Sequence, residues 1–221
     1  QFIFRMREFE QMEMQFFVPP GTELKWFDEW KEKRMKWHLA MGIEPEKYRF
    51  HKHDKLAHYA NAAYDIEFRF PFGFKEVEGI HSRTDFDLGN HAKFSGKKIT
   101  YFDPELNQSY VPYVIETSIG VDRMVLMNLA NGFSEEKVKK EDSEGEDVRT
   151  VLKFPAPLAP IKLAVLPLLR KDGLPEKAEQ ILKDVRLDYR CQYDEKDSIG
   201  RRYRRQDAIG TPYCVTVDQQ T

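Results

Sequence analysis

The stretch Glu116-Thr117-Ser118-Ile119-Gly120-Val121-Asp122-Arg123 decides the fold, because it predicts a junction between a buried strand and a short helix. Upstream, residues 110–115 are apolar, aromatic and β-branched, which is typical of a buried strand. Downstream, apolar residues at helical spacing continue to Ala130, and Gly132 is placed to end the helix. The junction therefore brings a carboxylate, a hydroxyl, a glycine and an arginine into an apolar core.

Two interpretations of Glu116 and Arg123 stay open on these residues alone. Charged side chains are rarely buried unless they are paired or take part in function. The two side chains form either an internal ion pair, which is the preferred interpretation, or part of a ligand site.

The beginning of the chain, residues 4–17, alternates in a way that predicts one long strand. One parity forms an apolar face, made of Phe4, Met6, Met12, Met14 and Phe16. The other parity forms a polar face, made of Arg5, Arg7, Phe9, Gln11, Glu13 and Gln15. A solvated outer surface explains most faces of this kind. The order of cations, aromatic ring and carboxylate also suits a phosphate, a flat base and an ammonium group.

Three segments, in chain order, resemble glycyl-tRNA synthetases of the dimeric type, which are class II aminoacyl-tRNA synthetases. Residues 7–13, Arg-Glu-Phe-Glu-Gln-Met-Glu, resemble the second strand of class II motif 2. Residues 79–88, Gly-Ile-His-Ser-Arg-Thr-Asp-Phe-Asp-Leu, resemble the run before the second core strand of that family, and residues 116–123 resemble motif 3. The resemblance covers nearly the whole chain, and three ordered matches are more specific than any single one.

The resemblance implies an α+β fold in two domains. Residues 1–157 would form part of the class II catalytic domain, an antiparallel sheet flanked by helices. Prolines at 155, 157 and 160 mark the expected boundary. Strands predicted at 161–169, 187–193 and 213–218 alternate with helices at 174–185 and 198–210, which indicates a parallel or mixed α/β sheet. By the resemblance, residues 158–221 would begin the mixed-sheet α/β anticodon-binding domain.

We expect the chain to be a fragment of a longer protein. It begins with Gln1, and it lacks the Arg-x-Glu that starts motif 2 and the motif 1 dimerisation segment. We therefore expect the chain alone not to form an adenylate.

Residue roles come from the resemblance, position by position. Arg5 and Arg123 would be catalytic, with Arg5 on an ATP phosphate, and Phe9 and Arg123 on the two faces of adenine. The implied ATP-binding residues are Phe4, Arg5, Phe9, Glu76, Val77, Gly120 and Arg123. The implied glycine-binding residues are Phe9, Glu13, Glu116, Thr117, Ser118 and Gly120. Glu76 would also contact the Mg²⁺ that accompanies ATP.

The implied function is that of a glycine–tRNA ligase, which uses ATP to activate glycine and transfers it to tRNA(Gly). The implied setting is a cytoplasmic homodimer with no membrane partner. The alternative is a catalytically inactive synthetase-like protein that binds nucleic acid as an accessory subunit. Such a protein would be expected to lose Glu13, Glu116 or Arg123, and all three are present.

Composition agrees with a globular protein of one large or two smaller domains: the 221 residues are 41% hydrophobic and 33% charged. The net charge of −2 excludes a wholly basic nucleic-acid binder but not a local basic patch. Cys191 and Cys214 form no disulfide framework. No apolar run approaches the roughly 20 residues that span a bilayer.

Four further expectations concern single segments. Residues 22–41 and 56–65 are expected to be helices, 66–70 and 74–80 strands, 90–108 a surface hairpin and 133–147 a mobile loop. His51 and His53 are two residues apart, but no further ligands at suitable spacing surround them, so a metal site is rejected. Glu76 and Glu78 share one parity, which usually means exposure. Either salt bridges or RNA contacts explain the arginines of the last helix, Arg201, Arg202, Arg204 and Arg205.

Overall fold

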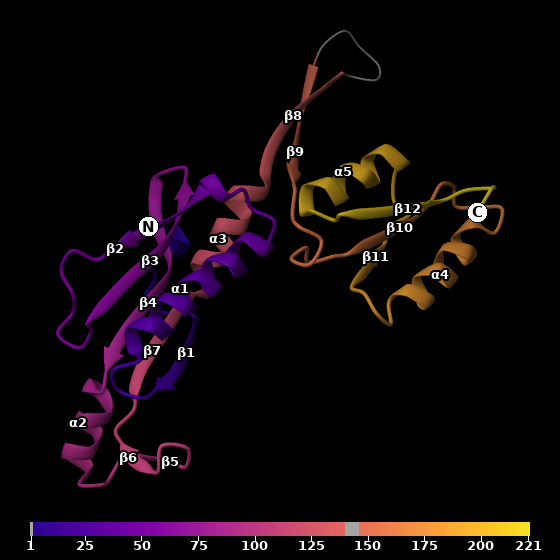
Figure 1. Cartoon of the computed structure of the whole chain (residues 1–221). Helices are drawn as coiled ribbons and strands as arrows, with labels where there is room; N and C mark the ends of the chain where they lie inside the picture. The colour runs from indigo at the N-terminus through magenta and orange to yellow at the C-terminus, as the bar shows by residue number, and fades with distance from the viewer. Residues whose placement is uncertain (1, 140–145) are drawn as a thin grey trace. The chain divides into compact units, whose positions relative to one another are not determined.

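The computed structural model describes residues 2–139 and 146–221 (Figure 1). The chain falls into two units, Gln1–Met127 and Asn128–Thr221. The domain boundary expected at 157/158 stays a prediction. The two units are defined by contacts in space, whereas the predicted domains are defined by similarity to a family.

A five-stranded antiparallel sheet forms the centre of the first unit, in the order β1-β7-β4-β3-β2. Its strands are β1 (Gln11–Val18), β2 (Tyr48–Lys52), β3 (Ala62–Phe70), β4 (Gly73–Thr84) and β7 (Tyr113–Gly120). Around the sheet lie η1 (Phe2–Phe4), α1 (Glu23–Ala40), η2 (Pro45–Lys47), α2 (Phe86–Ser95), the hairpin β5 (Tyr101–Asp103) and β6 (Gln108–Tyr110), and α3 (Val121–Gly132).

Helix α1 covers one face of this sheet (Figure 1). Apolar side chains alternate inward along the strands to meet it, among them Phe16, Tyr48, Tyr64, Ile66, Phe68, Ile80 and Ile115. Aromatic contacts lock the helix in place: the ring of Phe16 lies 5.4 Å from Trp30, and the ring of Phe27 lies 6.0 Å from Tyr64. The other face carries the polar side chains described below.

An ion cluster is buried beneath α1. Arg34 Nε lies 2.6 Å from Glu78 Oε1, and His38 Nε2 lies 2.7 Å from Glu78 Oε2. The expectation that Glu76 and Glu78 share an exposed face is wrong. The register between β3 and β4 shifts at this point, since Ile66 pairs with Glu78 but Glu67 pairs with Glu76. This bulge turns the side chain of Glu78 into the core, where it is 0% exposed.

Two predictions near the sheet are wrong. The helix expected over 56–65 does not form, because residues 62–65 pair with β4 and the residues before them are irregular. Cross-strand pairing there outweighs the helical preference of alanine. The first strand begins at Gln11 rather than near residue 4, because its partner β7 ends opposite, at Gly120. The strands predicted at 66–70 and 74–80 and the helix predicted at 22–41 lie close to β3, β4 and α1. Strand β2 was not predicted, and β7 spans Tyr113–Gly120 rather than 110–115.

The segment 90–108 is a hairpin only in part. Its first residues belong to α2, which ends at Gly96 in the left-handed region with φ +67°. The strands β5 and β6 then form the predicted hairpin.

The second unit contains a parallel sheet in the order β11-β10-β12, and its strands alternate with helices as predicted. Its elements are β10 (Leu163–Pro167), α4 (Leu174–Val185), β11 (Cys191–Tyr193), α5 (Ile199–Ile209) and β12 (Tyr213–Val217). Buried Val165, Leu174, Ala178 and Val217 form its core.

Ahead of this sheet, β8 (Phe133–Lys139) and β9 (Glu146–Leu152) form an antiparallel pair. The mobile loop expected over 133–147 is therefore wrong for the described parts, 133–139 and 146–147, and residues 140–145 lie outside the described residues. The charged side chains of this segment form ion pairs across the two strands. Arg149 lies 2.7 Å from Glu136, and Lys137 lies 3.1 Å from Glu146.

Gly210, which ends α5, gives a first testable prediction. Its φ is +77°, and an added Cβ would overlap the ring of Phe154 and lie 3.2 Å from the carbonyl oxygen of Leu152. We expect Gly210→Ala to lower the free energy of unfolding by about 3–4 kcal/mol, from left-handed strain plus overpacking. The measurement is urea unfolding followed by circular dichroism.

Gly173 is the matched control, because its φ is +75° and, among the described residues beyond its local chain neighbours, no heavy atom lies within 4 Å of an added Cβ. Gly173→Ala carries the strain alone, so we expect a loss of about 1–2 kcal/mol. Equal losses in the two variants would contradict the packing account.

Among the described residues, the structure contains no helix that is both long and apolar enough to span a membrane.

Candidate active site

The uncovered face of the five-stranded sheet carries the polar residues of the predicted site. In the pairing of β1 with β7, Gln11 lies opposite Gly120, Glu13 opposite Ser118, and Gln15 opposite Glu116. Opposed residues of paired strands share a face, so these side chains form one surface. On the next strand, His81 lies opposite Glu116 and extends the surface.

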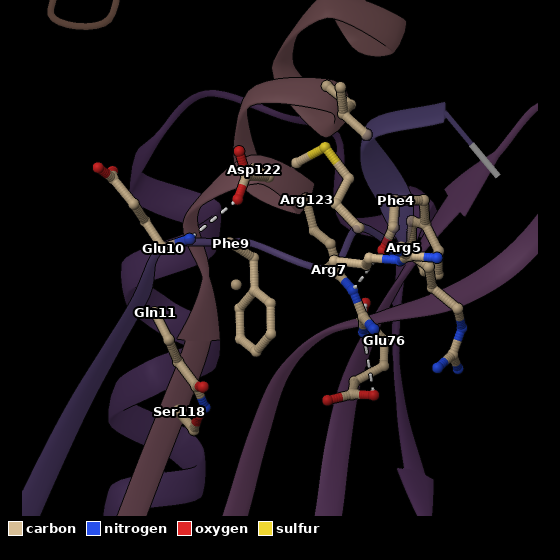
Figure 2. A pocket seen from close by; sticks show the side chains of 13 residues that line it. Phe4, Arg5, Arg7, Phe9, Glu10, Gln11, Glu76, Ser118, Asp122 and Arg123 are labelled. Atoms are coloured by element: carbon tan, nitrogen blue, oxygen red, sulfur yellow. Dashed lines mark hydrogen bonds and ion pairs between the residues drawn. The ribbon is translucent and has the colours of Figure 1, made fainter.

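A cavity of about 590 Å³ opens at one end of this surface (Figure 2). Seven predicted site residues line it: Phe4, Arg5, Phe9, Glu76, Ser118, Gly120 and Arg123. The sequence analysis assigned no site role to its other lining residues, which are Ile3, Met6, Arg7, Glu10, Gln11 and Asp122. Arg7 and Gln11 do belong to the polar parity predicted for this segment, and that parity was the signal that pointed to them.

The segment before β1 is held against the start of α3. Val121 N donates to Glu10 O at 2.9 Å, and Glu10 N donates to Asp122 Oδ2 at 3.1 Å (Figure 2). A carboxylate in the first turn is also favoured by the helix dipole. The cavity wall from Arg5 to Glu10 is therefore anchored although it is not a strand.

Arg123 is fixed in the cavity wall by contacts with Phe4 and Glu76. Its guanidinium lies 4.3 Å from the centre of the Phe4 ring, Nε donates to Phe4 O at 3.3 Å, and Nη1 donates to Glu76 Oε2 at 3.1 Å. In Figure 2 the ring of Phe9 stands on the other side of the opening from Glu76 and Arg123. A flat base fits between such an aromatic ring and a guanidinium plane.

The ion pair expected between Glu116 and Arg123 is wrong. Arg83 Nη1 lies 3.0 Å from Glu116 Oε2, whereas Arg123 pairs with Glu76. Strand β7 continues to Gly120, so Glu116 lies in mid-strand, four residues before the strand ends. At about 3.3 Å per residue, this distance separates Glu116 from the helix that carries Arg123.

Glu116 is held as an anion. Burial alone would disfavour its charge, but His81 at 3.6 Å, Gln15 at 2.7 Å and Arg83 together lower its pKa to about 2. The residue is 6% exposed. A carboxylate accepts about four hydrogen bonds, so one further donor can still bind there.

Glu13 on β1 lies opposite Ser118 on β7 and diagonally across from Glu116 on the same strand as Ser118. Diagonal residues of an antiparallel pair are roughly 7–8 Å apart, within joint reach of one small cation. Gln11 Nε2 donates to Glu13 Oε1 at 2.9 Å and also contacts Ser118 Oγ.

Four predicted site residues lie outside the cavity lining: Glu13, Val77, Glu116 and Thr117. Thr117 lies opposite Met14 and Ile80, so its side chain faces the core, and Val77 is buried at the bulge. Only the backbone of these last two residues can meet a ligand on the polar face. Their roles stay predictions.

Glu76 suits the metal role implied for it. Its side chain is 47% exposed, and it stands in the cavity wall beside Arg123. Mg²⁺ usually keeps several waters and is bound by one or two carboxylates plus substrate phosphates. The single carboxylate of Glu76 fits this pattern.

Three of the four arginines of α5 make internal contacts, and two of them, Arg204 and Arg205, form salt bridges. Arg202 is buried and donates to the carbonyl oxygens of Asp197 and Pro167. Arg205 pairs with Asp194 at 2.7 Å, and Arg204 pairs with Asp147 at 3.0 Å. Arg201 is exposed.

Comparison with solved structures identifies the fold. The chain is similar to a Giardia lamblia prolyl-tRNA synthetase in complex with prolyl-adenylate, with a TM-score of 0.67 and 17% sequence identity, over 100% of this chain and 43% of that one. Residues 162–221 match the family described as the anticodon binding domain. The antiparallel sheet, its helices and the following α/β unit therefore have the fold of class II aminoacyl-tRNA synthetases, as predicted.

The particular family follows from the sequence comparisons. The glycine–tRNA ligase of Chlorobaculum tepidum is 54% identical over 221 residues, covering 100% of this chain and 46% of that protein. That of Treponema denticola is 52% identical over 220 residues, covering 98% and 49%. The chain is thus homologous over its whole length to glycine–tRNA ligases, which confirms the resemblance. It spans about half the length of these curated relatives.

Proposed function

We propose that the protein containing this chain is a glycine–tRNA ligase, which activates glycine with ATP and transfers it to tRNA(Gly). The observation that carries the proposal is Glu116, a buried anion beside Glu13 and close to a cavity lined by arginines and an aromatic ring. Relatives named glycine–tRNA ligase at about half identity support it.

The cavity suggests how ATP would bind. Arg5 and Arg7 line it and provide positive charge for phosphates. Adenine would stack between Phe9 and Arg123, an interaction worth roughly 0.5–2 kcal/mol. Mg²⁺, bound with ATP, would neutralise phosphate charge beside Glu76.

Glycine would bind with its ammonium between Glu13 and Glu116, next to Ser118. Its carboxylate would then attack the α-phosphate of ATP, forming glycyl-adenylate and pyrophosphate, before transfer of the acyl group to the terminal ribose of tRNA. The residues contribute positioning and charge neutralisation, and no covalent enzyme intermediate is required. One added methylene is discriminated by only about 1–3 kcal/mol in a hydrophobic pocket. Selection of glycine therefore needs a site in which protein atoms occupy the space that the side chain of any larger amino acid would need.

The wider setting is part of the same proposal. The second unit would contact tRNA(Gly), since residues 162–221 match an anticodon-binding family. The whole protein would act as a cytoplasmic homodimer, and residues 1–221 alone would not form adenylate. Adenylate formation by this chain alone would contradict the last statement.

The accessory-subunit alternative is less well supported. A protein that only bound nucleic acid would have no need to hold Glu116 ionised with Arg83, Gln15 and His81 in a buried position.

ATP–pyrophosphate exchange by the whole protein tests the proposal, with glycine, alanine and serine offered separately. We expect exchange with glycine, and an exchange rate at least about a hundredfold lower with alanine or serine. A steric clash with their side chains would add to the weak discrimination that one extra methylene gives. Exchange with none of the three, in a folded sample, would favour the accessory-subunit alternative.

A further inference from the structure

Three potential metal ligands meet on the polar face of the sheet, away from the cavity. They are His53, which follows β2, Asp65 on β3 and His81 on β4. One ligand atom from each lies within 4.8 Å of the other two. In a tetrahedral zinc site, ligand atoms about 2.0–2.3 Å from the ion are roughly 3.3–3.8 Å apart. Small shifts of the three side chains would therefore bring their ligand atoms to distances that suit a bound ion.

One imidazole nitrogen of each histidine in this cluster has no hydrogen-bond partner in the part of the chain that the structure describes. His53 Nε2 lies 2.8 Å from Asp65 Oδ1, but the two are not aligned for a hydrogen bond. His81 Nδ1 is likewise buried without a hydrogen-bond partner among the described residues. Leaving a buried polar atom unpaired is unfavourable, and a bound cation would pair these nitrogens.

Gly79 gives the imidazole of His81 its position. A Cβ at Gly79 would lie 2.8 Å from His81 Cε1, so the ring occupies the space that any side chain there would fill. Gly79 is also the cross-strand partner of Asp65. The ring of His81 therefore lies over the backbone directly opposite the carboxylate, with the ring of His53 5.9 Å away at 86°.

We propose that His53, Asp65 and His81 form a binding site for a divalent transition-metal ion of the zinc class. Two imidazoles and one carboxylate suit Zn²⁺, whereas Mg²⁺ and Ca²⁺ prefer oxygen ligands alone. The fourth position is left for water or for Glu116, whose Oε1 lies 3.6 Å from His81 Nδ1. The bound ion would tie the irregular residues 53–61 to the sheet next to Glu116.

This site escapes sequence analysis because its ligands come from three segments. The rejection of a metal at His51 and His53 considered spacing along the chain alone. His51 lies outside the cluster, and its Nδ1 is 3.3 Å from Glu67. His53 finds its partners through the pairing of β2, β3 and β4.

Titration of the metal-free whole protein with Zn²⁺, followed by calorimetry, tests the proposal. We expect one equivalent to bind per chain, and Co²⁺ to give the visible spectrum of a tetrahedral site without sulfur ligands. Asp65→Asn and His81→Gln should each weaken this binding by about a hundredfold or more, since even indirect partners of a metal contribute ten- to a hundredfold. Gly79→Ala keeps all three ligands and should also weaken binding, by displacing the His81 ring.

His51→Gln is the matched control, because it removes a neighbouring histidine outside the cluster and should leave binding unchanged. Circular dichroism and the melting temperature of each metal-free variant establish that it folds. If a variant does not fold, the Co²⁺ spectrum of the unmodified protein decides alone. The proposal would be overturned if Zn²⁺ showed no saturable binding or if the Co²⁺ spectrum indicated sulfur ligands. Binding to folded Asp65→Asn and His81→Gln with the affinity of the unmodified protein would also overturn it.

Discussion

Replacing Glu116 by glutamine is expected to lower glycine-dependent exchange by the whole protein about a thousandfold. Glutamine keeps the shape of the side chain but removes the charge that would face the ammonium of glycine. Loss of one partner from a desolvated charge pair costs about 2–5 kcal/mol, and about 4 kcal/mol corresponds to a thousandfold change. Arg83 would keep its ion pair with Asp87 at 2.8 Å, so the fold should change little.

The measurement separates the two substrates. We expect the KM for glycine to rise while the KM for ATP stays within about threefold, because Glu116 lies outside the cavity assigned to ATP. Glu105→Gln, in the exposed turn between β5 and β6, is the control and should behave as the unmodified protein does. Exchange by Glu116→Gln within fivefold of the unmodified protein would remove Glu116 from the glycine site.

Arg34→Met is expected to destabilise the first unit by about 3–5 kcal/mol. The variant leaves the 0% exposed carboxylate of Glu78 without its arginine partner, beside the imidazole of His38. Breaking a buried ion pair by removing one member costs this much, because the other charge stays desolvated. The effect should not depend on any catalytic role.

Tryptophan fluorescence during urea unfolding measures this loss in the first unit. The chain contains three tryptophans, and all of them, Trp26, Trp30 and Trp37, lie on α1. Lys33→Met, next along the helix, is the control: its side chain is 55% exposed and its ion pair with Glu29 is 3.7 Å long, so we expect less than about 0.5 kcal/mol.

A double variant tests the mechanism. Adding Glu78→Leu to Arg34→Met removes the unpaired carboxylate and should recover part of the loss, while His38 Nε2 loses its partner at the same time. If both variants were equally unstable, lost packing rather than an unpaired charge would be the cause.

Local pattern determined several features of this protein without any structure. The period-two pattern around residues 11–15 identified the polar face, because strand side chains alternate whatever their partner is. The pattern of residues 161–218 predicted their order of strands and helices, because each element is short, apolar on one side and bounded by glycine or proline. Three motifs in order identified the synthetase family.

Tertiary structure alone decided which charges meet. Glu116 pairs with Arg83, 33 residues away, and Glu78 with Arg34, 44 residues away. One bulge at Val77 turns Glu76 outward and Glu78 inward, although both have the same parity in the sequence. Strand pairing likewise made Ala62–Asp65 a strand and gathered His53, Asp65 and His81. Spacing along the chain determines on which face of its own helix or strand a side chain lies. Which side chains it contacts depends on the register between elements that are joined only through long loops, and spacing does not determine that register.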